Sequence, residues 1–158
     1  MAVQVAVCGP ASCTEAEAAA AYQVGRLLAQ RGAVVVCGGG TGVMAAAAAG
    51  ARSAGGLVVG VLPGATREGA SPDLSVAVVT QLGQARNAVI VWSADAVVAV
   101  GGSWGTLSEV ALAMRRGGVP VVWLGGWRLA GRDGTAVPGI AYATGPDEAV
   151  ELALGGPG

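Results

Sequence analysis

The sequence predicts an α/β fold in three layers, a doubly wound parallel sheet with helices on both faces. Short runs of β-branched residues alternate with alanine-rich stretches of helical length, which is typical of a sheet that helices cover on both sides. The apolar runs are unbroken, as in strands buried on both faces. The chain has 158 residues, so we expect residues 1–158 to form a single domain.

The first half of the chain predicts three strands and two helices. Thr14 followed by Glu17 has the spacing of a capping box and marks the start of the first helix. The second helix consists mostly of alanine, which permits close packing against the sheet. The expected strands are residues 3–7, 34–36 and 57–62, and the expected helices are residues 14–30 and 43–54.

The second half continues the alternation after a polar loop at residues 63–73. The segment 125–139 has no clear period, and we interpret it as a loop or a short hairpin. The expected strands are residues 75–79, 96–100, 119–124 and 140–143, and the expected helices are residues 84–92, 107–116 and 146–154. Right-handed crossovers then make the sheet Rossmann-like, with a ligand crevice at the carboxyl ends of the strands.

The missing residue types exclude several mechanisms. All nine basic residues are arginines, and Lys and His are absent. Without Lys there is no pyridoxal-phosphate aldimine, so the protein is not a decarboxylase of that kind, and there is no P-loop lysine. Without His there is no Ser-His-Asp relay and no imidazole-ligated zinc.

Charge and cysteine content bear on partners and location. A net charge of −1 provides no field to attract a polyanion, so we expect no nucleic-acid partner. No apolar run approaches the ~20 residues of a membrane span, and an odd number of cysteines favours a reducing compartment. We therefore expect a cytoplasmic protein with no membrane partner.

The three cysteines, Cys8, Cys13 and Cys37, have two interpretations. Two of them would form a metal or redox pair, or all three are small buried side chains and loop thiols. The absence of His and of a second CxxC favours the latter, so we expect no metal site.

Two glycine-rich turns are the first candidates for a binding site, because each lies between a buried strand and the start of a helix. Free backbone amides at a helix N-terminus bind a phosphate without lysine. The alternative is that the glycines only permit tight turns. The candidate phosphate- or nucleotide-binding residues are Gly39, Gly40, Thr41 and Gly42 in the first turn and Gly101, Gly102, Ser103, Gly105 and Thr106 in the second.

Two charged residues lie beside these turns. Glu109 falls in the first turn of the helix expected at residues 107–116, where it either complements the helix dipole or faces a sugar ring. Arg86 begins an otherwise apolar helix and must reach either solvent or a ligand.

Three segments resemble the LOG (Lonely Guy) family, long mislabelled lysine decarboxylases. The segment 101–109, GGSWGTLSE, is similar to the family's GGxGTxxE motif. The segment 37–44, CGGGTGVM, followed by Gly50-Ala51, is similar to its GGGxxGxM segment. Arg86-Asn87, followed by residues 93–96, resembles the region before the signature. The resemblance covers residues 3–124.

The resemblance implies a nucleoside 5'-monophosphate phosphoribohydrolase that releases free base and ribose 5-phosphate. Glu109 and Arg86 would be the catalytic pair, and Gly102, Gly105 and Thr106 would hold the phosphate. A carboxylate suits this chemistry because it stabilises an oxocarbenium-like sugar or activates water. Asn87 and Trp104 are expected beside the base. The family also implies a homodimer or homotetramer, and no cofactor is required.

Two departures indicate a different branch. Val100 stands where the hydrolases usually have Pro, and Asn87 stands where they usually have Lys. The chain therefore looks closer to a short bacterial branch that includes molybdenum-cofactor carrier proteins, in which the same cradle would hold a pterin phosphate without turnover. The small-molecule partner is then a nucleotide, a phosphate or the molybdenum cofactor. A third interpretation is a nucleotide-sensing oligomer with a vestigial site.

Overall fold

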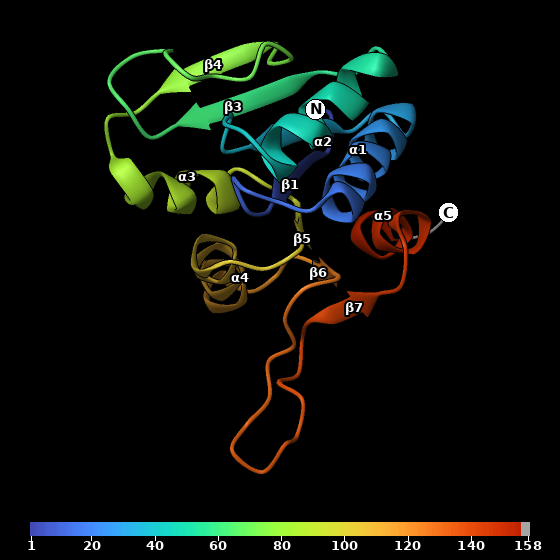
Figure 1. The fold of residues 1–158 in the computed structure, drawn as a ribbon. Helices are drawn as coiled ribbons and strands as arrows, with labels where there is room; N and C mark the ends of the chain where they lie inside the picture. The colour runs from blue at the N-terminus through green and yellow to red at the C-terminus, as the bar shows by residue number, and fades with distance from the viewer. Residues whose placement is uncertain (156–158) are drawn as a thin grey trace.

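A computed structural model describes residues 1–155 and shows a seven-stranded, entirely parallel sheet in the order β4-β3-β2-β1-β5-β6-β7 (Figure 1). The strand order reverses between β1 and β5, which is where ligands bind in open sheets of this kind. The strands are β1 (Gln4–Cys8), β2 (Val34–Cys37), β3 (Val58–Leu62), β4 (Val76–Val79), β5 (Ala96–Val100), β6 (Val121–Leu124) and β7 (Ala141–Ala143).

Helices cover both faces of this sheet. On one face α1 packs against α2 and α5, and on the other α3 packs against α4. The helices are α1 (Glu15–Gln30), α2 (Val43–Ser53), α3 (Arg86–Trp92), α4 (Trp104–Arg116) and α5 (Pro146–Leu154), and a 3-10 turn, η1 (Gly83–Ala85), precedes α3. The three-layer Rossmann-like fold predicted from the sequence is confirmed. None of the helices within residues 1–155 is long and apolar enough to cross a membrane.

The core consists of two apolar layers that the sheet separates. Successive side chains of a strand point to opposite faces, so Val5 and Val7 belong to the layer under α1 and α2, whereas Ala6 and Cys8 belong to the layer under α3 and α4. All five residues of β5 are buried. This explains the unbroken apolar runs, because both faces of the central strands are covered.

Three predicted boundaries differ from the structure by two or three residues. Helix α3 begins at Arg86 rather than at residue 84, because residues 83–85 form the 3-10 turn η1. Helix α4 begins at Trp104, three residues before the expected start, because the Ser103 side chain accepts a hydrogen bond from the Thr106 N–H at 3.1 Å and caps the helix. Glu109 consequently lies in the second turn of α4. Strand β6 begins at Val121 rather than at residue 119, since Gly117 and Gly118 both have positive φ and turn the chain after α4.

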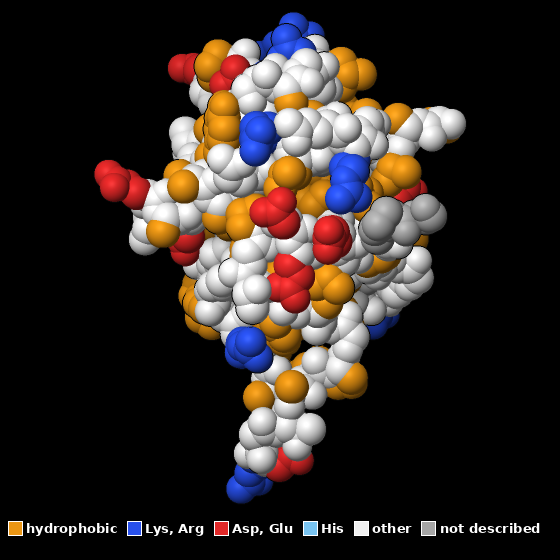
Figure 2. Space-filling model, turned by 90° about the vertical axis from the view of Figure 1, so that its right-hand side faces the viewer, with side chains coloured by type: hydrophobic (Ala, Val, Ile, Leu, Met, Phe, Trp, Pro, Cys, Tyr) orange, Lys and Arg blue, Asp and Glu red, His pale blue; other side chains and the backbone are white. Residues whose placement is uncertain are grey.

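The segment between β6 and β7 projects from the body of the molecule (Figures 1 and 2). An isolated antiparallel bridge joins Ala130 to Ala136, so the short-hairpin interpretation of this segment is confirmed. Its exposed tip includes Arg132 and Asp133.

The start of α1 carries the predicted capping box. The Thr14 side chain accepts from the Glu17 N–H at 3.1 Å, and the Glu17 carboxylate accepts from the Thr14 N–H at 2.9 Å. We expect Thr14→Ala to lower the free energy of unfolding by ~1 kcal/mol, because one N–H of the helix loses its acceptor. Urea denaturation measures this change, and Thr14→Ser, which keeps the hydroxyl, should stay close to wild type. An equal loss in both variants would contradict the assignment.

Candidate functional site

The site is built around a cavity of about 180 Å³ at the carboxyl edge of the sheet, beside the point where the strand order reverses. The loop after β1, the start of α2, the η1–α3 segment and the first turns of α4 form its walls. Its lining residues are Gly9, Ala11, Met44, Gln84, Arg86, Asn87, Ser103, Gly105, Thr106 and Glu109.

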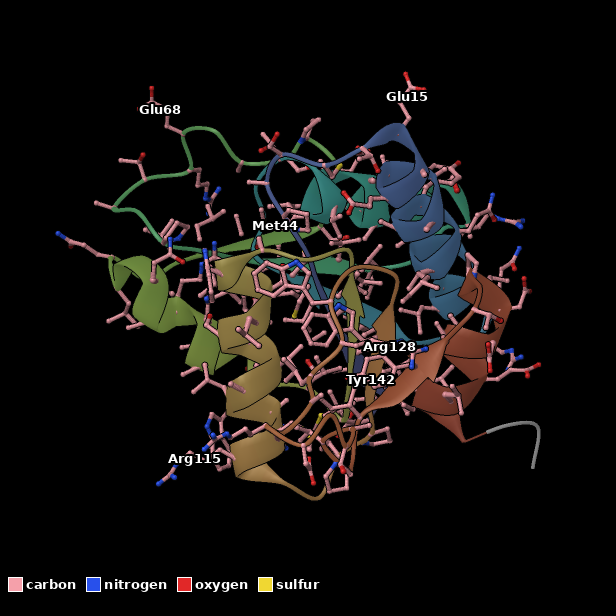
Figure 3. The ribbon with its side chains drawn as sticks, turned by 60° about the horizontal axis from the view of Figure 1, so that its bottom comes forward. Glu15, Met44, Glu68, Arg115, Arg128 and Tyr142 are labelled. Atoms are coloured by element: carbon pink, nitrogen blue, oxygen red, sulfur yellow. The ribbon has the colours of Figure 1, made fainter. Side chains whose placement is uncertain are left out.

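A second cavity, of about 350 Å³, lies beside the first and shares Arg86 with it. The turn after β2 and the loop after β3 form this cavity. It is lined by Gly38, Gly40, Leu62, Pro63, Gly64, Thr66, Glu68, Gly69 and Arg86. In Figure 3 Met44 lies near the centre of this edge, and Glu68 lies on the peripheral loop and points away from the body.

Arg86 is the only cation that lines either cavity among the described residues. Its side chain is only 8% exposed, and its Nε is buried without a hydrogen-bond partner. Within residues 1–155 it forms no salt bridge, including with Glu109. A Cβ at Gly38 would collide with its Nη1, so the guanidinium packs closely against the backbone of Gly38. The structure thus holds a positive charge in place without supplying an acceptor.

Glu109 lines the same cavity and is 6% exposed. Burial raises its pKa from 4.5 to about 7, an effect only partly offset by the charge of Arg86 and by a hydrogen bond with Cys8. A carboxyl group in this range exchanges a proton near neutral pH. Arg86 and Glu109, predicted from the sequence as a pair, therefore face one cavity.

The two cysteines at the strand ends are buried thiols. Burial, then the charge of Glu109, raises the pKa of Cys8 well above its ordinary value. Burial likewise raises the pKa of Cys37 to about 11. Both cysteines and the half-buried Cys13 are free. Among residues 1–155 no group of three or more acidic or cysteine side chains is arranged to hold a metal ion.

The N-terminus of α4 has free hydrogen-bond donors, and one of them, the Gly105 N–H, belongs to a residue that lines the first cavity. Ser103 caps the Thr106 N–H, and its Oγ lies 2.9 Å from the Thr106 Oγ1. Within the described chain the N–H groups of Trp104 and Gly105 have no acceptor. A helix N-terminus of this kind favours an anion.

The N-terminus of α2 differs because the β1–α1 loop covers it. The Val43 N–H donates to the Pro10 carbonyl at 3.0 Å, and the Thr41 hydroxyl donates to the Ala11 carbonyl at 2.9 Å. Gly42 has a φ of 64°, and a Cβ there would collide with Pro10 and Ala11. Some hydrogen-bond donors of the first glycine turn are thus already bonded to the β1–α1 loop and are not available to a ligand.

Three other predicted residues, Gly101, Gly102 and Trp104, lie near tryptophan side chains outside the two cavities. Gly101 accepts a 2.7 Å hydrogen bond from the Trp123 Nε1, and Gly102 packs under Trp127, where a Cβ would lie 2.7 Å from the Trp127 Cδ1. Trp104 is 79% exposed and meets Trp127 edge to face at 5.1 Å. None of these residues lines the two cavities.

The structure therefore brings together six of the predicted residues in the first cavity and one, Gly40, in the second beside Arg86. The six are Arg86, Asn87, Ser103, Gly105, Thr106 and Glu109. Asn87 is buried and donates to the Ser108 Oγ at 3.0 Å. Gly39, Thr41, Gly42, Gly101, Gly102 and Trp104 lie outside both linings.

Sequence reasoning missed the cavity residues that the loop after β1 and the start of α2 contribute, namely Gly9, Ala11 and Met44, and also Gln84. A topological signal existed for Gly9 and Ala11, because the loop after the first strand must open at the same sheet edge as the loop after the fifth. Met44 is the methionine that ends the GGGxxGxM-like segment, so a signal for it existed in the motif. Nothing in the local pattern indicated Gln84.

Comparison with known proteins gives concordant matches. A family model described as the SLOG cluster4 family matches residues 2–150. A protein of Archaeoglobus fulgidus described as uncharacterized is 44% identical over 115 residues, which are 73% of this chain and 76% of the relative.

Several solved structures are similar over nearly the whole chain. The molybdenum cofactor binding protein from the phototrophic bacterium Rippkaea orientalis superposes with a TM-score of 0.87 at 34% identity, covering 98% of this chain and 97% of that one. The Moco carrier protein of Chlamydomonas reinhardtii superposes with a TM-score of 0.86 at 32% identity, covering 98% of this chain and 97% of that one. DNA processing protein A from Helicobacter pylori superposes with a TM-score of 0.71 at 17% identity, covering 97% of this chain and 80% of that one. At this identity the similarity shows the fold alone.

Proposed function

Because the chain belongs to the SLOG cluster4 family, we propose that it binds and carries a phosphorylated heterocycle, with the molybdenum cofactor or a close chemical relative as its cargo. Two of its structural relatives are described as a molybdenum cofactor binding protein and a Moco carrier protein. These relatives favour the carrier over the phosphoribohydrolase that the LOG resemblance implies.

Arg86 is the observation that carries this proposal. A buried charge is costly unless it is paired, and among the described residues Arg86 has neither a salt bridge nor an acceptor for its Nε. A planar guanidinium binds a phosphate through two parallel hydrogen bonds. An anionic group of the ligand is therefore the missing partner.

The phosphate of this ligand is placed between Arg86 and the start of α4. There the free N–H group of Gly105 and the hydroxyl of Thr106, both from residues that line the first cavity, add donors to the guanidinium. Neutral Glu109 is compatible with an anion in the same cavity, whereas ionised Glu109 would repel it. In this proposal the phosphate-binding residues are therefore those of the second glycine turn.

The experiment is to identify the molecule that copurifies with the protein. Heat-denatured protein should release a phosphorylated pterin, detectable by mass spectrometry and by the absorbance of the ring, because a carrier retains its cargo. Arg86→Gln, purified in parallel, should release little or none. Protein that copurifies with no pterin, and that takes up none when molybdenum cofactor is added, would contradict the carrier proposal.

N-glycosidic hydrolysis is the second candidate, and one observation favours it: Glu109 and Arg86 line one cavity. A carboxyl group whose pKa is near 7 is suited to general acid or base work. In this case AMP or a prenylated AMP yields free base, measured by chromatography, and Glu109→Gln abolishes the release. No base release from a panel of nucleotides would remove this candidate.

We propose further that the protein forms a homodimer or homotetramer, and that its partner is a small molecule rather than a nucleic acid. Exposed apolar side chains lie on β4, directly before η1 and on α3, where a second copy would cover them. They are Val76, Val78, Val79, Leu82, Val89 and Trp92.

A further inference from the structure

We propose that the second cavity is a slot for the planar ring of the ligand, so that the ligand spans both cavities with Arg86 between its phosphate and its ring. This inference rests on the proposed function, because it assigns the two parts of a phosphorylated heterocycle to the two cavities. It goes further in naming the residues that select the ring, in the turn after β2 and the loop after β3.

The lining of the second cavity suits a flat, uncharged ring. Four of its nine residues are glycines, Gly38, Gly40, Gly64 and Gly69, and Leu62 and Pro63 add apolar surface. Peptide groups without side chains let a ring approach closely, and a guanidinium stacks on aromatic faces. The cavity is also the larger of the two, about 350 Å³ against 180 Å³.

The first cavity offers a phosphate more favourable contacts than the second. The first N–H of α2, that of Val43, is bonded to the Pro10 carbonyl, whereas the first two N–H groups of α4, those of Trp104 and Gly105, have no acceptor among the described residues. The second cavity contains no cation besides Arg86 and includes the acidic residue Glu68. We therefore assign the phosphate of the ligand to the first cavity and its ring to the second.

Gly64 and Gly105 are glycines that the fold does not require. Neither has a positive φ; no atom lies within 4 Å of a Cβ built at Gly64, and at Gly105 the nearest atom is the Ser103 Oγ at 3.8 Å. Gly105 is the second residue of α4, where alanine would be the better helix former. The space that their missing side chains leave is open to a ligand, in the second cavity at Gly64 and in the first at Gly105.

Met44 and Arg86 form the wall between the cavities. Met44 lines the first cavity, and its Cε would lie 3.1 Å from a Cβ at Gly40, which lines the second. Methionine is flexible and adapts to irregular shapes, so the Met44 side chain can give way to a ligand that spans both cavities.

The test compares Gly64→Leu with Gly105→Leu by titration calorimetry, using inorganic phosphate and a pterin that carries a phosphate monoester as probes. Gly64→Leu should weaken binding of the pterin phosphate at least tenfold and leave phosphate binding unchanged, because leucine fills the ring slot alone. Gly105→Leu should weaken binding of both. Ala65→Leu is the matched control, since this neighbouring exposed residue lines neither cavity and should bind as wild type does.

The outcomes separate the slot from the proposed function. If Gly64→Leu binds the pterin phosphate as tightly as wild type, or loses phosphate to the same extent, the slot is overturned while the carrier proposal stands. If the wild-type protein binds neither probe, the proposed function fails and the slot fails with it. Matching thermal melts of all variants show that each change acts on binding rather than on folding.

Discussion

Arg86→Gln is expected to weaken binding of a phosphorylated pterin by ~100-fold or more without destabilising the protein. Hydrogen bonds to charged groups contribute ~1.5–3 kcal/mol each, and the guanidinium is placed to make at least two with a phosphate. Loss of two such bonds corresponds to this change in affinity. Titration calorimetry at pH 7 measures it.

Unaltered stability is the more diagnostic half of this prediction. Removing one partner of a buried ion pair destabilises strongly, because the other charge stays buried. Arg86 forms no salt bridge among residues 1–155, and Glu109, on which its charge acts, can take up a proton when that charge is removed. Its replacement by a neutral residue should therefore keep or raise the melting temperature of the ligand-free protein. Arg67→Gln is the control, since it removes an exposed charge from the loop after β3 outside both cavities. Equal losses of affinity in both variants would show a general charge effect instead.

Glu109→Gln is expected to remove a pH dependence of folding stability. The folded-state pKa of Glu109, about 7, lies above its ordinary value of 4.5, so the native state binds this proton more tightly than the unfolded chain. The stabilising contribution is fully present below pH 4.5 and is lost as the pH rises through 7. Between pH 5 and pH 8 the wild-type protein should lose about 2 kcal/mol relative to the variant.

Urea denaturation of both proteins at several pH values tests this. The difference in unfolding free energy should change steeply between pH 5 and 7 and level off above pH 8. Glu68→Gln, which alters an exposed carboxylate of the second cavity, should follow the wild-type curve. If the difference between wild type and Glu109→Gln stays constant across this range, Glu109 titrates in the normal acidic range and the buried-acid assignment is wrong.

Local features of the sequence predicted most of the fold. Every expected strand and helix is present, because valine-rich runs buried on both faces and a capping box are patterns among near neighbours in the chain. The resemblance to the LOG-like branch that includes carriers is confirmed by the family and structural matches. The error at α4 had a local cause: Ser103 caps the helix in spite of the glycine at its second position.

The sequence by itself thus determined the order of the elements, the edge of the sheet where the two cavities lie, and the residue types that could hold an anion without lysine. It could not distinguish the two glycine turns, which look alike as strings of letters. Tertiary structure decided that Pro10 and Ala11 cover the start of α2 and that the start of α4 keeps free donors. It also decided that Arg86 is buried between two cavities. The physical reason is that a hydrogen-bond donor is free or occupied according to which distant segment packs against it; Thr41 and Ala11, for example, are 30 residues apart.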